Sequence, residues 1–310
     1  PGPTAFIMDI SFIIVNWNTR DLLRDCLESI FNTVDTLTYE VIVVDNASKD
    51  GSVEMLAEQY PQVKVIANAE NRGFGAANNQ GFAAMKGEYA LLINTDAVLT
   101  AGAVRKLWDF AEGRPDAAIV CGQLLNADGS KQNSIASFPT LLSLAVNTSL
   151  LEYLFPGRYP SKRYDHQEPL EVDSAVGACM MIRKKALDEV SFFDERYFFF
   201  FEETDMAYAM KQAGWKIYQV PDARTFHLQG QSIGHNSRSR IEFYRSRYQF
   251  LRKWKSKAYY RLASSIIIVR LVLTFLLNAL GVLATLGLAE KIRGKTRVYL
   301  DIIVWHFSRG

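Results

Sequence analysis

The feature that most constrains the fold of this chain is a strict alternation of apolar, β-type runs with helical segments across residues 10–120. Such alternation is typical of a parallel, doubly wound sheet with helices on both faces. The carboxyl ends of parallel strands meet at one edge of the sheet, where such folds bind their ligands. We expect strands at 10–15, 41–44, 63–66, 89–93 and 117–120, and intervening helices at 20–31, 52–59, 75–85 and 103–111.

Charge divides the chain into two parts. Residues 1–237 hold 20 Lys/Arg and 30 Asp/Glu, whereas residues 238–310 hold 15 Lys/Arg and 3 Asp/Glu. This split indicates an acidic globular domain followed by a basic tail with its own partner, either nucleic acid or an anionic membrane surface. We expect a domain at 10–237, with halves at 10–125 and 126–237, and residues 1–9 outside it.

The tail combines basic, aromatic and apolar residues. Residues 238–261 carry nine Lys/Arg among aromatic side chains, and residues 262–289 are apolar except for Arg270 and Asn278. The apolar stretch is long enough to span a bilayer, but basic residues flank it on both sides, which conflicts with the positive-inside rule for a single span. A re-entrant hairpin with Gly281 and Gly287 near its bends, or helices lying in the interface, fits better.

The apolar stretch argues against nucleic acid as the partner of the tail, so we expect a membrane surface. The tail could instead pair subunits, which would make the protein a homo-oligomer. The three cysteines form no CxxC pair, which disfavours a disulfide framework and favours a reducing compartment. Residues 1–8 lack the pattern of a signal peptide.

Three polar residues follow the expected strands and should lie along one edge of the sheet: Asn16, Asp45 and Asp96. Asp45 could accept a hydrogen bond from the N3–H of a pyrimidine, or could simply form part of an ordinary β-to-α turn. Asp96 could supply one oxygen ligand to a hard divalent cation that bridges two phosphates, or could be a solvated strand end.

A run of small and polar residues at 71–79 opens a helix and suits an anion at the helix N-terminus. Arg72 could contact a phosphate, and Gly73 could allow close approach of the backbone to a ligand. The run superficially resembles the dinucleotide fingerprint GxGxxG, but it follows the third strand and ends in Asn. We therefore discount NAD.

Two further segments carry side chains that are suited to chemistry. Four phenylalanines at 198–201 precede Glu202, Glu203 and Asp205 at a helix start. Acids here could be helix-dipole partners, but burial beside aromatic rings also raises a carboxyl pKa and makes a better general base. His227 could be structural or could bind an Mn²⁺-like ion, with Gly230 leaving room beside it.

Together these residues resemble family-2 inverting glycosyltransferases with a GT-A fold, over roughly residues 10–235. The motifs that carry the resemblance occur in order: Asn16, VVDNASKDGS, NRGFGAANNQG, INTDA, GACMMIR, FDERYFFFFEETDM and HLQGQS. The subgroup with this pattern is rich in bacterial rhamnosyltransferase-like enzymes of cell-surface polysaccharide assembly, including O-antigen and cell-wall synthesis. The resemblance implies an α/β GT-A domain, with a mostly parallel sheet flanked by helices. The charge and apolar pattern of the tail, outside this resemblance, predict that the tail at 238–310 is helical and associates with a membrane.

The resemblance also implies roles for individual residues. Glu203 stands where the family has its catalytic base, and Glu202 is a rival for that role. Asp96 and His227 would bind Mg²⁺ or Mn²⁺ on the donor diphosphate, and Asp45 would hold the nucleotide base. The expected nucleotide-sugar residues are Asn16, Asp45, Asn71, Arg72, Gly73, Asn78, Asn94 and Asp96, and the expected acceptor residues are Gly177, Ala178 and Asp205.

The chain departs from the family pattern at two positions. The family's Asp-x-Asp is here Asn94-Thr95-Asp96, and its catalytic Asp is here Glu203. With one carboxylate missing, Asp96 and His227 should converge within the reach of one metal ion although they lie 131 positions apart.

We expect dTDP-rhamnose or a UDP-sugar as the donor and a lipid-linked saccharide or polysaccharide as the acceptor. We expect the enzyme at the cytoplasmic face of the bacterial inner membrane. A non-catalytic carbohydrate- or nucleotide-binding module and a nucleotidyltransferase are the alternatives.

Overall fold

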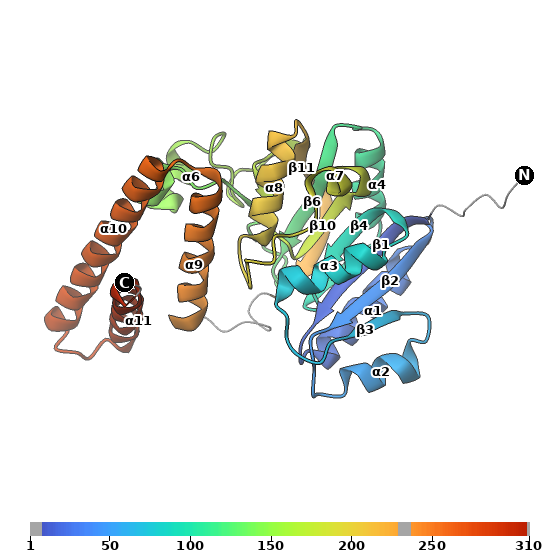
Figure 1. Ribbon diagram of the computed structural model, residues 1–310, viewed down its shortest axis with the longest axis horizontal. Coiled ribbons are helices and arrows are strands. Elements are labelled where there is room, and N and C mark those ends of the chain that lie inside the picture. The colour runs from blue at the N-terminus through green and yellow to red at the C-terminus, as the bar shows by residue number, and fades with distance from the viewer. Residues whose placement is uncertain (1–7, 229–236, 309–310) are drawn as a thin grey trace, which may run out of the picture. The chain divides into compact units, whose positions relative to one another are not determined.

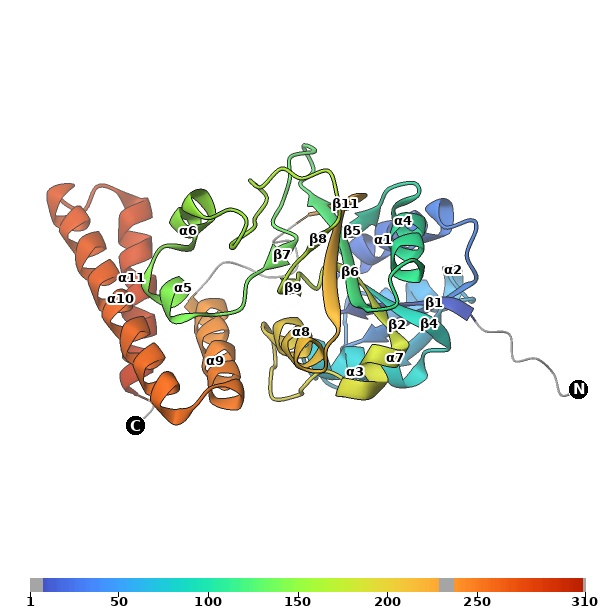
Figure 2. The ribbon, with the colours of Figure 1, turned by 90° about the horizontal axis from the view of Figure 1, so that it is seen from above.

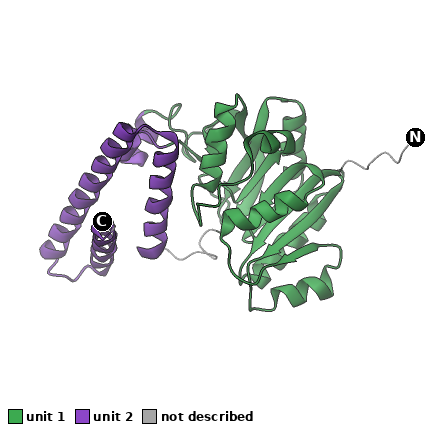
Figure 3. Cartoon of the chain, viewed as in Figure 1, with its two compact units in different colours: residues 1–138, 155–232 green, residues 139–154, 233–310 purple. Residues whose placement is uncertain are grey.

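The computed structural model describes residues 8–228 and 237–308. The first strand begins at Met8, so Met8 and Asp9 belong to the sheet and not to the region outside the fold, where the sequence interpretation had placed them. Residues 1–7, which were expected to lie outside the domain, are not among the described residues. The chain divides into two compact units (Figure 3): unit 1 comprises residues 1–138 and 155–232, and unit 2 comprises residues 139–154 and 233–310.

Unit 1 is an α/β unit (Figure 1). Its strands are β1 (Met8–Asn16), β2 (Tyr39–Asp45), β3 (Lys64–Ala67), β4 (Gly87–Ile93), β5 (Ala97–Leu99), β6 (Ala117–Leu125), β7 (Ile135–Ala136), β8 (Leu170–Glu171), β9 (Ser174–Ala175), β10 (Cys179–Arg183) and β11 (Lys216–His227). Its helices are α1 (Arg20–Thr33), α2 (Ser52–Gln59), α3 (Phe74–Ala84), α4 (Ala103–Glu112), α7 (Lys184–Val190) and α8 (Glu202–Gln212).

The main sheet has the order β3-β2-β1-β4-β10-β6-β11-β5, with β8 paired to β11. Strands β1 to β4 run parallel, as does the β6–β11 pair. Strand β10 inserts antiparallel between β4 and β6. The mostly parallel sheet is thus confirmed. The alternation in the first 120 residues could not predict the place of β10, because this strand comes from the second half of the unit.

Helices cover both faces of this sheet (Figure 2). Side chains of α1, α2 and α4 pack in one core with Ile10, Phe12 and Ile14 of β1. Those of α3, α7 and α8 pack in a second core with Ile13 on the opposite face, because successive strand residues point to opposite sides. The small residues of α3 bring it close to β1, since a Cβ at Gly81 would lie only 2.4 Å from Ile13 Cγ2.

Unit 2 is helical in its described part and consists of α5 (Leu141–Ala145), α6 (Thr148–Leu154), α9 (Ser237–Trp254), α10 (Lys257–Ala284) and α11 (Glu290–Phe307). Residues 139–154, which the sequence interpretation assigned to the first domain, belong to this unit. Leu144, Tyr248, Leu251, Ile267 and Ile302 form its core.

Helix α10 is long and apolar enough to cross a membrane, judged by length and composition alone. It runs unbroken to Ala284, so Gly281 lies inside the helix and not at a bend as expected. A Cβ at Gly281 would meet Ile292 of α11 at 3.4 Å, which indicates close packing of the two helices. The chain does turn at Gly287, whose φ of +75° favours glycine.

Candidate active site

Asp96 and His227 lie together because β5 pairs with the end of β11. In this antiparallel register His227 stands opposite Ala97, the residue after Asp96. His227 Nε2 lies 3.3 Å from Asp96 Oδ1, and the Leu228 amide donates to the Asp96 carbonyl at 2.9 Å. Both side chains are buried. The prediction that these two side chains lie close together is therefore confirmed.

The pair is suited to a divalent cation but does not enclose one by itself. Two ligands at right angles, each about 2.1 Å from an Mg²⁺-sized ion, would lie about 3 Å apart, close to the separation seen here. Among the described residues, no cluster of three or more His, Cys, Asp or Glu side chains could hold a metal ion. Further ligands would have to come from substrate or water, so metal binding at Asp96 and His227 stays a prediction.

A glutamine orients the imidazole ring of His227. Gln132 Oε1 lies 3.0 Å from His227 Nδ1, and Gln132 Nε2 donates to the His227 carbonyl at 2.5 Å and to Asn126 Oδ1 at 2.7 Å. Because both amide protons of Gln132 are engaged elsewhere, its Oε1 must accept from Nδ1–H. The remaining nitrogen, Nε2, therefore faces Asp96. Metal-binding histidines are commonly oriented in this way.

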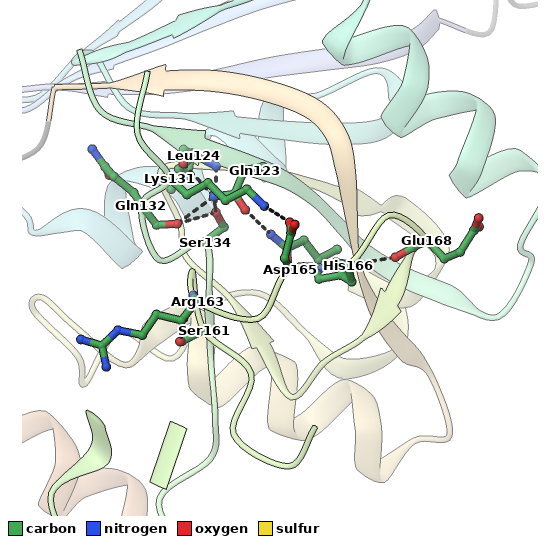
Figure 4. A network of polar contacts seen from close by, with 11 residues as sticks. Gln123, Leu124, Lys131, Gln132, Ser134, Ser161, Arg163, Asp165, His166 and Glu168 are labelled. Atoms are coloured by element: carbon green, nitrogen blue, oxygen red, sulfur yellow. Dashed lines mark hydrogen bonds and ion pairs between the residues drawn. The ribbon is translucent and has the colours of Figure 1, made fainter. Parts of the chain in front are cut away.

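The segment that carries Gln132 is itself held by a network of polar contacts (Figure 4). Gln123 Nε2 donates to the Gln132 carbonyl at 2.8 Å and to Ser134 Oγ at 3.0 Å. The Leu124 amide donates to Ser134 Oγ at 2.7 Å, and Lys131 pairs with Asp165 at 2.6 Å. The network anchors the segment to β6, so Gln132 is held in place by more than its contact with His227.

The carboxylate of Asp45 is buried and accepts hydrogen bonds at both oxygens. Asn16 Nδ2 donates to Oδ1 at 2.7 Å, and the Ser48 amide donates to Oδ2 at 2.9 Å. Asn16 and Asp45 are register partners in β1 and β2, so the sheet places them side by side. Thr19 Oγ1 continues the chain of contacts, to Asn16 Oδ1 at 2.8 Å and to Thr95 Oγ1 at 2.9 Å. The three predicted edge residues thus belong to one region of the site.

Residues 71–73 form the turn into α3, and residues 74–78 begin the helix. Gly73 has a φ of +86°, and a Cβ there would lie 2.7 Å from the Phe198 carbonyl. The close approach at Gly73 is therefore to the phenylalanine run of the same chain. Asn71 Oδ1 accepts from the Gly73 amide at 2.9 Å, Asn78 Nδ2 donates to the Phe74 carbonyl at 3.0 Å, and Arg72 is exposed.

Glu203 lies in the first turn of α8, and its Oε2 is buried and accepts no hydrogen bond from the described residues. Burial raises the pKa of Glu203 above the ordinary glutamate value. Backbone N–H groups of Gly177, Thr204 and Glu203 itself oppose this shift by stabilising the carboxylate, but burial prevails. A raised pKa makes a carboxylate a stronger base than an ordinary glutamate.

The neighbouring acids of α8 are buried as well. Glu202 and Asp205 are each 3% exposed. Tyr197 Oη donates to Asp205 Oδ1 at 3.0 Å, so Asp205 is tied to the protein at this oxygen. Phe200 and Phe201, which precede α8, both have left-handed backbones, with φ of +69° and +74°. Such strain often occurs at functional sites and here directs the start of α8.

The segment before β10 connects the two halves of the site. The Asn94 amide donates to the Ala178 carbonyl at 2.9 Å, and a Cβ at Gly177 would lie 3.9 Å from Glu203 Oε1. The structure therefore brings the strand end of Asp96, the Gly177-Ala178 segment and Glu203 into one region. Gly230, expected beside His227, lies outside the described residues.

Sequence reasoning did not identify Gln132, Thr19 or Tyr197. These residues act through contacts across 95, 76 and 8 positions respectively. Gln132 lies in an irregular stretch without periodicity, so its contact with His227 had no local signal.

The mostly parallel sheet, with the antiparallel β10 inserted between β4 and β6, is the sheet of a GT-A fold. Among solved structures, the mannosyltransferase PcManGT from Pyrobaculum calidifontis in complex with GDP-Man and Mn²⁺ matches with a TM-score of 0.56 and 15% identity, over 98% of this chain and 87% of that one. Residues 1–349 of S. aureus TarS match with a TM-score of 0.53 and 15% identity, over 84% and 70% of the two chains. At these identities the likeness supports the fold alone.

Residues 11–191, more than half of the chain, match the family described as Glycosyl transferase family 2. The chain belongs to this family. A curated relative, the N-acetylglucosaminyl-diphospho-decaprenol L-rhamnosyltransferase of Mycobacterium tuberculosis, is 30% identical over 68% of this chain and 74% of its own length. The Poly(ribitol-phosphate) beta-glucosyltransferase of Bacillus spizizenii is 34% identical, but over only 39% of this chain and 20% of its own. Family membership favours an enzyme that transfers sugar over the binding module and the nucleotidyltransferase.

Proposed function

We propose that this glycosyltransferase moves a sugar, rhamnose in the first instance, from a dTDP- or UDP-sugar to a lipid-linked saccharide with inversion at the anomeric carbon. The name of the M. tuberculosis relative supports both rhamnose and a diphosphate-linked polyprenol acceptor. The meeting of Asp96 with His227, in the same region as Glu203, is the observation that carries the proposal.

Glu203 acts as the general base in this proposal. Its carboxylate takes the proton of the acceptor hydroxyl while that oxygen forms a bond to the anomeric carbon. The bond from the anomeric carbon to the donor phosphate breaks, and the diphosphate leaves with the electron pair. Attack from the opposite face inverts the configuration. Gly177 and Ala178 line the acceptor side, because Gly177 has no side chain to fill the space beside Glu203 Oε1.

The nucleotide binds along the edge of the sheet in this proposal. Asp45 accepts the N3–H of a pyrimidine, and Asn16 and Ser48 hold its carboxylate in place for that contact. Asn94 and Asp96 lie at the diphosphate, with Arg72 as an exposed cation for the phosphates. Asn71, Gly73 and Asn78 shape the turn that bounds this region.

Asp96 and His227 are the residues that would hold Mg²⁺ or Mn²⁺. The ion would supply Lewis-acid stabilisation of the negative charge on the departing diphosphate. Gln132 keeps the imidazole in the tautomer that presents Nε2 toward Asp96. The remaining shell is left to substrate oxygens and water.

Unit 2 associates with the membrane in this proposal. Leu277 and Leu283 of α10 are each 70% exposed, which is costly in water and favourable against lipid. The basic residues of the tail suit an anionic leaflet, and a reducing compartment suits the three free, buried cysteines. These features support a position at the cytoplasmic face, close to a lipid-linked acceptor.

A thermal-shift screen of nucleotide-sugars with and without Mn²⁺ tests the donor and the metal together, because a ligand that binds only the native state raises the melting temperature. We expect dTDP- and UDP-sugars to raise Tm and Mn²⁺ to enlarge the shift. In Asp96→Asn and His227→Ala the Mn²⁺-dependent part should vanish, while the metal-free part remains. A larger shift with GDP- or ADP-sugars would contradict the proposed role of Asp45, and a shift that is independent of Mn²⁺ would contradict the metal site.

A further inference from the structure

An arginine of unit 2 has a guanidinium nitrogen that is buried and has no hydrogen-bonding partner among the described residues. Arg247 of α9 is half-buried, and its Nε is buried and forms no hydrogen bond with the described residues. The guanidinium lies over the rings of Phe243 and Tyr244, at 4.6 Å and 5.4 Å from their centroids. Cation–π contacts offset only part of the cost of desolvating a charge. Burial lowers the pKa of Arg247, and the nearby Tyr244 opposes this shift.

A second arginine adds positive charge near Arg247. Arg270 is the one charged residue of the apolar stretch 262–289. Its Nη1 donates to the carbonyls of Leu144 at 2.9 Å and Val146 at 3.0 Å, at the end of α5. These contacts hold the guanidinium in place but bring no opposite charge. Its positive charge also lowers the pKa of Arg247, so the two cations repel each other.

Tyr244 lies among these cations. Burial raises the pKa of Tyr244, and the positive charges of Arg247, Arg270 and Arg240 act in the opposite direction. Arg240 is exposed and lies over the ring of Tyr299, at 5.7 Å from its centroid. A phenol donor and several guanidinium groups therefore share one region formed by α9, α10 and α11.

No carboxylate in the described part of unit 2 pairs with Arg247. Glu242 pairs with Arg245, Asp301 accepts from Ser237 Oγ at 2.7 Å, Glu290 lies 3.8 Å from Arg293, and Glu152 forms no ion pair with a described residue. An anion from outside the chain would therefore supply a charge that the described carboxylates of unit 2 do not bring to Arg247.

We propose that Arg247, Arg270 and Tyr244 form a binding site for the phosphate group of a membrane lipid. Guanidinium groups present planar sets of donors that match phosphate oxygens, and Tyr244 adds a neutral donor. A lipid is the favoured carrier because Arg270 lies midway along α10, whose exposed face is rich in leucine. An arginine in such a helix is costly and usually marks a functional site. The inference goes beyond the proposed sugar transfer and does not depend on it.

Binding of the full-length protein to vesicles tests this site. The probes are phosphatidylcholine vesicles that contain, at matched net charge, phosphatidate, a polyprenyl diphosphate or the carboxylate lipid oleate. We expect the wild type to prefer both phosphate lipids over oleate. Arg247→Gln should weaken binding to the phosphate lipids by about tenfold, the loss expected for one hydrogen bond between charged groups. The matched control Arg238→Gln removes an exposed charge from the same helix and should lower binding to all anionic vesicles alike.

Melting temperatures measured in detergent distinguish a loss of folding from a loss of lipid binding. Phosphate lipid should raise the Tm of the wild type and not that of Arg247→Gln. Without lipid, Arg247→Gln should be at least as stable as the wild type, because the substitution removes a half-buried charge that no described carboxylate pairs with. Arg247→Lys keeps the charge but not the planar set of donors, and should lose the preference for phosphate over oleate.

Equal binding to oleate and phosphate vesicles, or wild-type preference in folded Arg247→Gln, would overturn the site. An equal rise of Tm with inorganic phosphate alone would overturn the lipid as its carrier. If the protein prefers the polyprenyl diphosphate to phosphatidate, the result supports a site that binds the lipid-linked acceptor. If it binds the two equally, the result supports a site that binds ordinary membrane phospholipid. None of these assays requires sugar transfer, so failure here and failure of the proposed function remain distinguishable.

Discussion

Asp45 and Glu203 are two carboxylates of unit 1 in opposite surroundings. Both oxygens of Asp45 accept hydrogen bonds, from Asn16 and from the Ser48 amide. Glu203 Oε2 is buried and accepts none from the described residues, and burial raises its pKa. The first arrangement fixes a charged group in one geometry, whereas the second leaves a group ready to take a proton. Two carboxylates of the same unit thus differ in their surroundings, and this difference is the basis for proposing that Asp45 binds the nucleotide and that Glu203 takes the proton.

Glu203→Gln tests the proposed role of Glu203 as the general base, and it has the largest expected effect. We expect kcat to fall by about 10²- to 10⁴-fold, the usual contribution of a general base, while donor binding by calorimetry stays unchanged. Glu202→Gln should retain far more activity, and the exposed Glu58→Gln should match the wild type. A larger loss in Glu202→Gln than in Glu203→Gln would transfer the base role to Glu202.

Gln132→Met tests the contact of Gln132 with His227, which is proposed to orient the imidazole for a metal ion. Methionine keeps the length of the side chain but cannot accept from His227 Nδ1–H, so the imidazole loses its orientation. We expect Mn²⁺ affinity to fall by about 10- to 100-fold, measured by electron paramagnetic resonance with the nucleotide diphosphate present. The ¹⁵N shifts of His227 should show mixed tautomers. Unchanged affinity, equal to that of an exposed control, Gln59→Met, would remove Gln132 from the site.

Asp45→Asn tests the proposed binding of the nucleotide base by Asp45. The amide still fills the space, but it loses a charge-assisted hydrogen bond to the pyrimidine, which corresponds to about tenfold in affinity. The KM for the donor should therefore rise about tenfold with little change in kcat, in steady-state assays. Asp21→Asn, an exposed change, is the control. A fall in kcat with KM unchanged would argue against a role in binding the base.

The raised pKa of Glu203 predicts the pH dependence of activity. Activity should fall as pH decreases through this pKa, because the protonated carboxyl cannot accept a proton. The acid limb of kcat/KM should therefore lie above the ordinary glutamate pKa. An acid limb at or below that value would contradict a buried base.

The same shift predicts a smaller effect on stability. A folded-state pKa above the unfolded value contributes stability that is present below the unfolded pKa and is lost as pH rises through the folded one. Glu203→Gln removes this loss, so the variant should be more stable than the wild type at neutral pH and not at acidic pH. Urea unfolding at both pH values measures the difference. Equal stability at neutral pH would indicate a well-solvated carboxylate.

Local patterns in the sequence were sufficient for the first half of the sheet. Apolar runs identified β1 to β4 and the start of β6, because β1, β2, β4 and β6 are mostly buried and the short, partly exposed β3 is still apolar at Val65 and Ile66. The place of β10 could not be predicted, since pairing between β4 and β6 depends on distant contacts. Strand β11 was missed for a related reason: polar residues and Pro221 interrupt its apolar pattern.

The candidate site shows the same division between local and distant information. Motifs identified Asp96 and His227, and the structure brings them together. Their common neighbour Gln132 has no motif and depends on the fold of a loop. The tail was expected to be helical, but the core that Leu144 of α5 forms with α9, α10 and α11 depends on packing over long sequence separation.

The pairing of β5 with β11 has a consequence for how the site can fail. Because His227 stands opposite Ala97, a slip of one residue would present Phe226 or Leu228 at that position and turn His227 to the other face. The register of this end of β11 changes between Gln219 and Arg224, where the strand is irregular against β6. A one-residue deletion at 220–223 would therefore separate His227 from Asp96 although both residues are still present in the sequence.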